Sequence, residues 1–332
     1  MKVLYPAYFK AFQCIASACP DSCCKEWAVD VDDQAAAFYR SLESPLGDRL
    51  RNVLKDTDDG TVMVIENGRC PMWRQDGLCR IQAELGHAAL CQVCQQFPRL
   101  RHDYGDFVEY GLELSCPEAA RLILSGPHHW IAEDLPGGES PEYDEEVMMI
   151  LQQSRNTILA FLDTTSLPVN EMLAVLLLYA HQVQGWIDGD DVAELDATEC
   201  ITLAKKYAAT GNWELLTSFF SGLEILTPQW HSRLQTPSAD SVWSNAYLPL
   251  IRYFIGRYWL QAVSDFDLIG RVKFSIAACL LVYHLGGNLA ETAQLFSKEI
   301  ENDPDNLETI LDGAYTAPAL TDIHLLSLLL NN

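Results

Sequence analysis

The sequence predicts a mainly α-helical protein, in which a small cysteine-rich α+β domain that binds metal is followed by an all-α helical domain. Nine of the eleven cysteines lie within the first 116 residues. Apolar residues recur at three- and four-residue spacing through most of residues 144–330, which is the period of an amphipathic helix. The chain has 332 residues, of which 49% are hydrophobic, so it can bury a core without disulfide bonds.

The composition changes near residues 126–145, where Gly, Pro, Ser and acidic residues cluster. Such clusters are typical of loops and linkers. We therefore expect a cysteine-rich, iron–sulfur- or other metal-binding domain over residues 1–126, a linker over residues 127–145 and an acidic helical domain over residues 146–332.

In the first part of the cysteine-rich domain, the sequence predicts one helix, one strand and one reversal of the chain direction. Asp32 or Asp33 is a candidate N-cap for a helix over residues 34–42. The β-branched run at residues 61–66 predicts a strand. The pair Asp76-Gly77 is a strong hairpin signal, and a reversal there would bring Cys70 and Cys79 towards each other.

Two further helices are expected before the linker. Residues 81–90 predict a short helix, and Cys91 and Cys94 follow at its C-terminal end. Residues 115–124 predict a second helix, because Pro117 suits the first helical position. Cys116 would then be the N-cap, where the helix dipole and the backbone N–H groups favour a thiolate.

The remainder of the chain is expected to form helices that are separated by short Gly-, Asn- and Pro-containing breaks. Cys200 and Cys279 lie on apolar faces of these helices and are expected to be small core residues. The expected helices cover residues 144–162, 170–186, 191–208, 212–225, 243–263, 270–285, 289–301, 305–313 and 319–330.

The clustered cysteines favour a metal centre over disulfide bonds. The odd number of cysteines and the adjacent pair Cys23-Cys24 suit a disulfide framework poorly. The C-x2-C spacing of Cys91 and Cys94 lets two thiolates from one turn reach one metal, and the first four cysteines read C-x4-C-x3-C-C. Our narrowest choice of ligands is Cys19, Cys23, Cys91 and Cys94, with Cys24 as the rival of Cys23. The full candidate set is Cys14, Cys19, Cys23, Cys24, Cys70, Cys79, Cys91, Cys94 and Cys116.

The spacing leaves both the metal and the number of centres open. A structural zinc ion takes four thiolate or imidazole ligands, and a 4Fe-4S cluster takes four thiolates. Nine cysteines could fill two such sites, or one site with structural thiols in addition.

The net charge of −24 is distributed unevenly. Residues 1–130 carry 13 Lys and Arg against 18 Asp and Glu, whereas residues 131–332 carry 9 against 28. So acidic a surface repels phosphate backbones, which argues against nucleic acid as a partner, and it favours a basic protein surface. The apolar runs at residues 173–180 and 276–283 are too short to span a membrane. We expect a cytoplasmic protein, with thiols that stay reduced.

Four cysteine-containing blocks resemble a known family. They are FQCIASACPDSCCKEW, RCPMWRQDGLCRIQAELG, LCQVCQQFPR and LELSCPEAARLIL. In this order and separation they resemble the bacterial flagellin lysine-N-methylases, which contain a cysteine-rich zinc- or iron-chelating domain. The resemblance covers residues 5–125 and continues more weakly at LAETAQLFSKEIENDPDNLETIL. It implies S-adenosylmethionine-dependent methylation of lysine ε-amines on flagellin, with a 4Fe-4S cluster that is held by some of these cysteines.

Two non-catalytic hypotheses stand beside this enzyme. One is a zinc- or iron-binding adaptor whose acidic helical domain docks a basic partner, and the other is a scaffold that owes its fold to zinc. The sequence has no G-x-G-x-x-G-like loop after a strand, so it assigns no catalytic or cofactor-binding residue. Side chains near the cysteine blocks that could contact substrate, cofactor or metal are Tyr5, Tyr8, Trp27, Arg80, His87, Arg99, His102, Tyr104, Tyr110 and Glu118.

Overall fold

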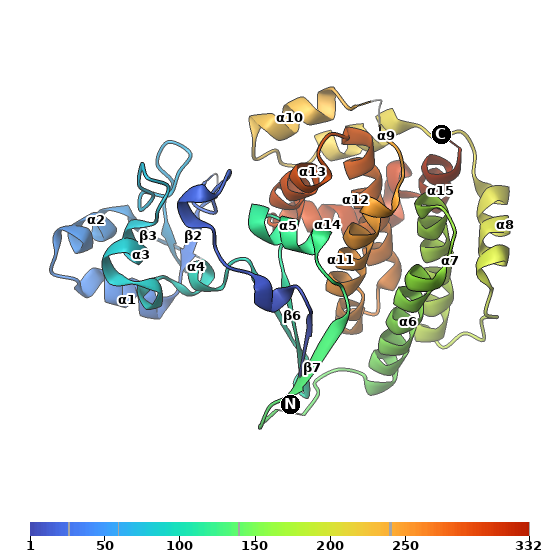
Figure 1. Ribbon diagram of the computed structural model, residues 1–332, viewed down its shortest axis with the longest axis horizontal. Helices are drawn as coiled ribbons and strands as arrows, with labels where there is room; N and C mark the ends of the chain where they lie inside the picture. The colour runs from blue at the N-terminus through green and yellow to red at the C-terminus, as the bar shows by residue number, and fades with distance from the viewer. Residues whose placement is uncertain (26, 59, 139, 239–240, 332) are drawn as a thin grey trace.

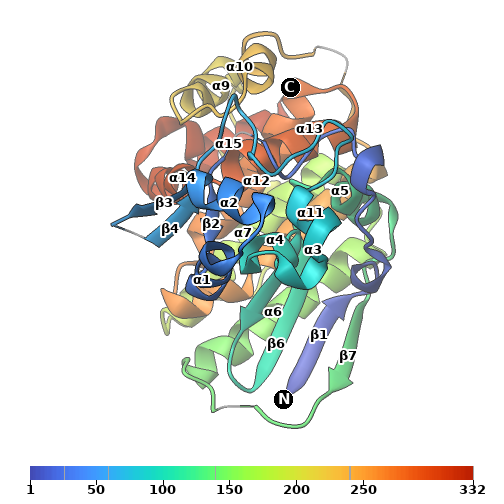
Figure 2. The ribbon, with the colours of Figure 1, turned by 90° about the vertical axis from the view of Figure 1, so that its left-hand side faces the viewer.

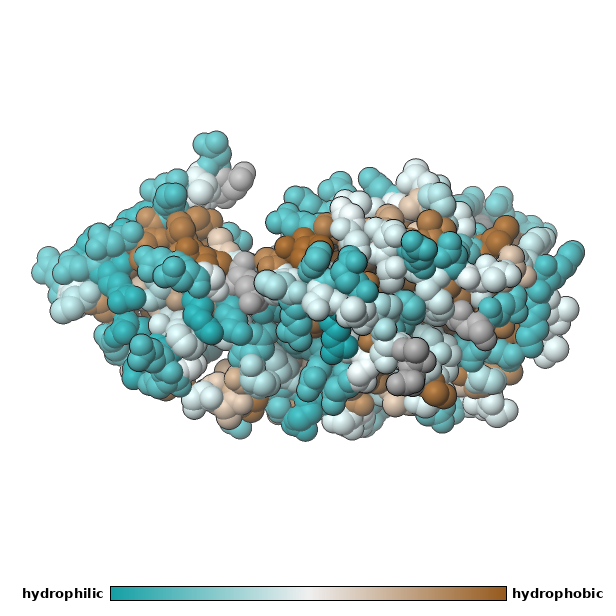
Figure 3. Space-filling view, turned by 90° about the horizontal axis from the view of Figure 1, so that it is seen from above, coloured by the Kyte–Doolittle hydropathy of each residue, from teal (hydrophilic) through white to brown (hydrophobic). Residues whose placement is uncertain are grey.

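The computed structural model describes residues 1–25, 27–58, 60–138, 140–238 and 241–331, and it shows two lobes of unequal size. The small lobe contains β2, α1, α2 and α4, and it projects from a larger body of helices (Figure 1). Seen from above, the surface is hollowed between the two lobes, and apolar residues lie on both sides of the hollow (Figure 3).

The small lobe is built from short elements around one buried cluster. Its three-stranded antiparallel sheet has the order β2-β4-β3. Tyr39, Leu50 and Met72 are fully buried at the centre of the cluster. The elements are β2 (Val29–Val31), α1 (Asp33–Ser41), α2 (Pro45–Val53), β3 (Leu54–Thr57), β4 (Gly60–Met63), α3 (Arg80–Leu85) and α4 (Gln92–Gln96).

A four-stranded sheet joins the small lobe to the helices. Its order is β5-β6-β1-β7, with bounds β5 (Arg99–Asp103), β6 (Phe107–Leu112), β1 (Lys2–Pro6) and β7 (Trp130–Asp134). The first strand lies between two late strands, parallel to β6 and antiparallel to β7 (Figure 2). The chain therefore leaves this sheet after β1, builds the small lobe, and returns to the sheet at β5.

The large lobe is helical, so the prediction of a mainly α protein is confirmed. Its core is one continuous cluster that also takes in Tyr8, Phe12, Leu112 and Leu114. The helices are α5 (Pro117–Ser125), α6 (Glu145–Thr164), α7 (Val169–Ile187), α8 (Ala197–Tyr207), α9 (Trp213–Ser221), α10 (Pro228–Gln235), α11 (Leu248–Tyr258), α12 (Leu268–Leu285), α13 (Leu289–Phe296), α14 (Pro304–Thr316) and α15 (Asp322–Leu330).

Most expected elements are present, with bounds that local signals explain. Asp32 caps α1 by accepting a hydrogen bond from the backbone of Ala35 at 2.9 Å. The expected helix over residues 191–208 begins only at Ala197, because Asp196 forms a capping box with Glu199. Cys200 and Cys279 are buried in the core, as predicted.

Several predictions about local structure were wrong. The expected helix over residues 81–90 ends at Leu85, because Gly86 has a φ of 87°, and a short 3-10 turn follows. Residues 243–263 divide into α11 and the two 3-10 segments that flank it, and residues 289–301 divide into α13 and a π-helical segment (Ser297–Glu301). Helix α10 and all strands of the four-stranded sheet were missed. Part of the expected linker over residues 127–145 is the strand β7.

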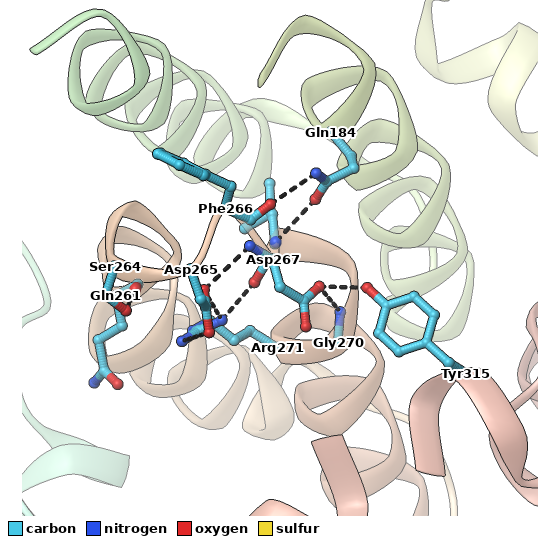
Figure 4. A network of polar contacts seen from close by, with 10 residues as sticks. Gln184, Gln261, Ser264, Asp265, Phe266, Asp267, Gly270, Arg271 and Tyr315 are labelled. Carbon is cyan, nitrogen blue, oxygen red and sulfur yellow. Dashed lines mark hydrogen bonds and ion pairs between the residues drawn. The ribbon is translucent and has the colours of Figure 1, made fainter. Parts of the chain in front are cut away.

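The turn before α12 shows how the helices are locked together (Figure 4). Phe266 has a φ of 61°, which is unusual for a residue other than glycine. Gln184 on α7 donates to the carbonyl of Phe266 at 2.8 Å and accepts from the backbone N–H of Leu268 at 2.9 Å. Arg271 pairs with both carboxylate oxygens of Asp265, at 2.8 and 2.9 Å. Contacts from two helices therefore hold this turn in place.

One helix among the described residues, α12, has the length and composition to cross a bilayer. In the folded chain 89% of that helix is buried inside the protein. Its apolar surface is therefore used in the core of the large lobe.

An ion pair fastens the four-stranded sheet to the helices. Glu109 on β6 accepts two hydrogen bonds from the guanidinium of Arg155 on α6, one of them at 2.8 Å. Their side chains are only 3% and 7% exposed. A charge buried in this way is tolerated only while its partner is present.

We predict that Arg155→Met lowers the free energy of unfolding by about 3–5 kcal/mol, because it leaves a buried carboxylate unpaired. The double variant Glu109→Leu/Arg155→Met should recover most of this loss. The matched control Arg121→Met removes an exposed pair with Glu118 and should cost less than about 1 kcal/mol. Urea denaturation measures all three variants, and equal losses for Arg155→Met and Arg121→Met would contradict the prediction.

Candidate functional site

Turns and helix starts of the small lobe carry most of the candidate thiols. The backbone N–H of Cys70 donates to the carbonyl of Cys24 at 2.8 Å, which joins the two segments. The predicted reversal at Asp76-Gly77 is present, with Gly77 at a φ of 80° and Cys79 bridged to Trp73.

Helix α4 begins at the second cysteine pair. Cys91 is its N-cap and Cys94 lies in its first turn. Asp32, which caps α1, also accepts a hydrogen bond from the backbone of Gln92 at 2.7 Å. Tyr39 on α1 donates to the carbonyl of Ala89 at 2.8 Å. These contacts hold the Cys91–Cys94 turn against α1.

Six thiols interact with one another in this lobe. Cys24 hydrogen-bonds to both Cys23 and Cys70. Cys91 hydrogen-bonds to Cys94. Cys79 interacts electrostatically with Cys23, Cys24, Cys70 and Cys91, and Cys94 interacts in the same way with Cys23 and Cys24. We call this set the six-thiol group; its members are Cys23, Cys24, Cys70, Cys79, Cys91 and Cys94.

The thiols of this group differ in acidity. The hydrogen bond from Cys94 lowers the pKa of Cys91 to about 7, and the same bond raises the pKa of Cys94. A hydrogen bond from Cys24 lowers the pKa of Cys70, whereas burial raises the pKa of Cys79. Cys91 is therefore the thiol most easily deprotonated, and a thiolate is the form that ligates metal.

The other three N-terminal cysteines form a separate neighbourhood. Cys116 interacts electrostatically with Cys19 and Cys14, and Cys19 also interacts with Cys23. Cys116 is the N-cap of α5, as predicted, but burial raises the pKa of its thiol to about 12. For the free thiol, the loss of solvent outweighs the hydrogen bonds of the helix start, and whether Cys116 ligates metal stays a prediction.

All donors of the six-thiol group are sulfur, a ligand type that zinc and iron–sulfur sites both accept. Among the described residues, no three His, Cys, Asp or Glu side chains are already close enough to enclose an ion. Of our narrow choice, Cys23, Cys91 and Cys94 belong to the six-thiol group, and Cys19 lies between it and the other three cysteines. Which of the nine bind metal stays a prediction.

Asp21, between Cys19 and Cys23, ties the cysteine loop to the large lobe. Lys298, in the π-helical segment, contacts the Asp21 carboxylate at 2.9 Å and is 3% exposed. Its ammonium also lies 5.2 Å from the ring centre of Trp27. Gln294 on α13 donates to Asp21 at 3.2 Å and to the carbonyl of Ser115 at 2.7 Å. No local sequence signal predicts this junction, because Asp21 is more than 270 residues away from both Gln294 and Lys298.

The other candidates chosen from the sequence are dispersed. Tyr5 donates to Glu133, Arg80 pairs with Glu84, and Glu118 pairs with Arg121. Arg99 lies over the ring of Phe12, and Tyr104 stacks on Phe107. His87 is exposed. Tyr8, His102 and Tyr110, by contrast, line one cavity.

This cavity lies between the four-stranded sheet and the helices α6 and α11. Its walls are formed by His102 and Glu109 on adjacent strands, Trp130 on β7, and Tyr253 and Arg257 on α11. The Nε2 atom of His102 is buried and has no hydrogen-bond partner among the described residues. The sequence signal for this cavity was Glu109, a charged residue within the otherwise uncharged strand FVEYGL.

We predict that serine at Cys91 or Cys94 lowers the metal content of anaerobically purified protein by at least half, because each loses a candidate ligand. Serine at Cys200, which is equally small and lies in the helical core, should leave the metal content unchanged. Elemental analysis of iron and zinc measures the effect. Full metal content in a variant that lacks Cys19, Cys23, Cys91 and Cys94 together would refute the assignment.

A second prediction concerns His102. Burial, and then the charge of Arg257, lower the pKa of His102 from 6.5 to about 4. Folding thus favours the neutral ring of His102. This preference stabilises the folded protein fully above a pH of about 6.5, and the stabilisation is lost as the pH falls towards 4. We expect this loss to be at most about 3 kcal/mol. Denaturation at pH 7 and pH 4.5 should show a smaller loss in His102→Gln than in wild type, whereas His87→Gln should match wild type.

Comparisons with known proteins give relatives but no solved structure. No family model matches the chain, and no solved structure matches it. The flagellar biosynthetic protein FliU of Salmonella muenchen is 33% identical over 138 residues, which are 38% of this chain and 78% of FliU. Two proteins named Lysine-N-methylase, from Salmonella typhimurium and Salmonella choleraesuis, are each 33% identical over 132 residues. The match covers 38% of this chain but only 33% of each methylase, so it spans about a third of their length.

These relatives agree with the resemblance that the cysteine blocks carry. FliU is matched over most of its length at an identity of 33%, and the two methylases are matched at the same identity. The chain therefore belongs to the flagellin lysine-N-methylase-like family.

Proposed function

We propose that this protein transfers methyl groups from S-adenosylmethionine to lysine ε-amines of flagellin, or of another basic protein that presents lysines. The single observation that carries the proposal is family membership, through relatives whose names refer to flagellar biosynthesis and to lysine methylation. The six-thiol group supports the proposal, because its cysteines belong to the sequence blocks that resemble the flagellin lysine-N-methylases.

The six-thiol group would hold the metal centre, with Cys23, Cys91 and Cys94 among its ligands and Cys24, Cys70 and Cys79 as the other donors at hand. When bound, a 4Fe-4S cluster supplies a thiolate-ligated redox centre, and zinc in its place supplies a structural crosslink. The junction between Asp21 and Lys298 holds the Cys19–Cys23 loop against the large lobe. We place the protein in the cytoplasm, where thiols stay reduced.

Lysine methylation sets two requirements that the chain has to meet. An exposed lysine has a pKa of about 10.4, so its ε-amine has to lose a proton before it can attack a methyl group. The acidic surface meets the other requirement, which is the encounter: residues 131–332 carry 28 Asp and Glu against 9 Lys and Arg. Such a surface attracts a lysine-bearing partner and speeds its association.

We predict that anaerobically purified protein incorporates label from methyl-labelled S-adenosylmethionine into flagellin of the same organism. The rate should fall as salt is raised from about 0.05 to 0.5 M, because exposed charges are screened over about 8 Å at physiological ionic strength. Mass spectrometry of the flagellin should locate the methyl groups on lysines.

Two controls separate the competing functions. Flagellin in which surface lysines are changed to arginine keeps its charge and should accept no label. Label incorporation that survives removal of the metal would give the metal a structural role. No incorporation by metal-loaded, folded protein would reject the enzyme in favour of a non-catalytic adaptor, which should still bind flagellin in a salt-sensitive manner.

A further inference from the structure

We propose that the groove between α9 and α10 in the large lobe is a docking site for a lysine side chain of the protein substrate. This inference rests on the proposed function and adds to it a place where the partner is held, apart from the six-thiol group. It is built on the polar face of α9, on the stacked ring of His284 and on the helix ends that meet at the groove.

The groove is open to solvent and large enough for a side chain of a partner protein. It has about 590 Å3 of accessible space, which is within the range of ligand sites in proteins. Helices α9 and α10 lie next to each other at the top of the large lobe (Figure 1). Among the described residues that line the groove, Glu214 is the one carboxylate, and none is Lys or Arg.

One face of α9 supplies the polar wall of the groove. Its four polar side chains are spaced three and four residues apart and so lie on one side of the helix; they are Glu214, Thr217, Ser218 and Ser221. The Thr217 hydroxyl donates to the carbonyl of Trp213 at 3.1 Å, and the Ser221 hydroxyl donates to the carbonyl of Thr217 at 2.8 Å. Because these protons are already used, both oxygens have only acceptor capacity left. Together with the Glu214 carboxylate they suit a ligand that only donates, such as the ammonium of lysine.

The ring of His284 gives the groove a flat surface. It lies parallel to the indole of Trp213, with ring centres 4.3 Å apart and 2° between the planes. Trp213 in turn neighbours Tyr283, which stacks on Trp243 at 4.2 Å. Burial lowers the pKa of His284, so its ring is uncharged at neutral pH and does not repel a cation. A lysine side chain can lay its alkyl stem on such a surface and keep its ammonium in solvent beside Glu214.

The helix ends at the groove also favour a cation. Helix α9 ends at Ser221 and α10 ends at Gln235, and both residues line the groove. The carboxyl-terminal end of a helix carries a partial negative charge. The end of α12 is offset by Arg233, which donates to the carbonyl of Gly286 at 2.9 Å. The groove therefore offers a carboxylate and two negative helix ends to a positively charged ligand.

The test adds N-acetyl-lysine methylamide to the full-length protein, purified without oxygen. This probe should shift the ring NMR signals of His284, whereas its Nε-acetylated form, which carries no charge, should not. Glu214→Gln should weaken the binding of the probe about two- to fivefold, as expected for one exposed ion pair. Ser218→Leu should weaken it further, because Ser218 is exposed and a larger side chain there fills the groove without disturbing the core. Glu194→Gln removes the same charge from another exposed position and should bind the probe as wild type does.

Methylation kinetics separate this inference from the proposed function. Ser218→Leu should raise the KM for flagellin more than it lowers kcat, because a docking contact adds binding without taking part in the chemistry. If wild type methylates flagellin but the probe leaves His284 unshifted, or shifts it equally in Ser218→Leu, the inference falls and the function stands. If the probe shifts His284 but flagellin is not methylated, the function falls and the lysine site stands. An equal shift by the Nε-acetylated probe would show that the ammonium is not recognised, which overturns the inference.

Discussion

The pairing of the first strand with two late strands is the constraint on which the rest of the structure depends. Because β1 lies between β6 and β7, the chain has to leave the sheet after Pro6 and return at Arg99, with the small lobe built between these points. The ion pair of Glu109 and Arg155 then fastens the sheet to α6. The position of the small lobe relative to the helices follows from these two features and from the contact of Asp21 with Lys298.

The π-helical segment Ser297–Glu301 connects the two regions of chemical interest. Lys298 reaches Asp21 in the cysteine loop, at one side of the segment. Three residues later, Glu301 accepts hydrogen bonds from Tyr253 at 3.1 Å and from Tyr258 at 2.7 Å, and it pairs with Arg257 of the cavity wall. π-helical insertions are frequent at functional sites because they redirect side chains within a helix. Here the segment places the ammonium of Lys298 against Asp21, and it places the carboxylate of Glu301 against residues of α11.

Family membership and geometry carry different parts of the functional argument. The cysteine blocks relate the chain to lysine methylases, whereas no feature of the blocks locates the lysine. The cavity at His102 lies outside the six-thiol group, on the face of the sheet that packs against α6 and α11. The six-thiol group and this cavity are therefore separate, and the junction of Asp21, Gln294 and Lys298 connects the cysteine loop to the large lobe.

The sequence by itself determined features that arise within a few residues. Helical periodicity and caps placed α6, α7, α12 and α14, Asp76-Gly77 placed a reversal, and the cysteine spacing identified the family. Only the tertiary structure decided the pairing of β1 with β6, the burial of Cys116 beside Cys14 and Cys19, and the cavity at His102. The physical reason is range: a cap or a turn is satisfied by its own neighbours, whereas a buried charge such as Glu109 is satisfied only by a partner on another element.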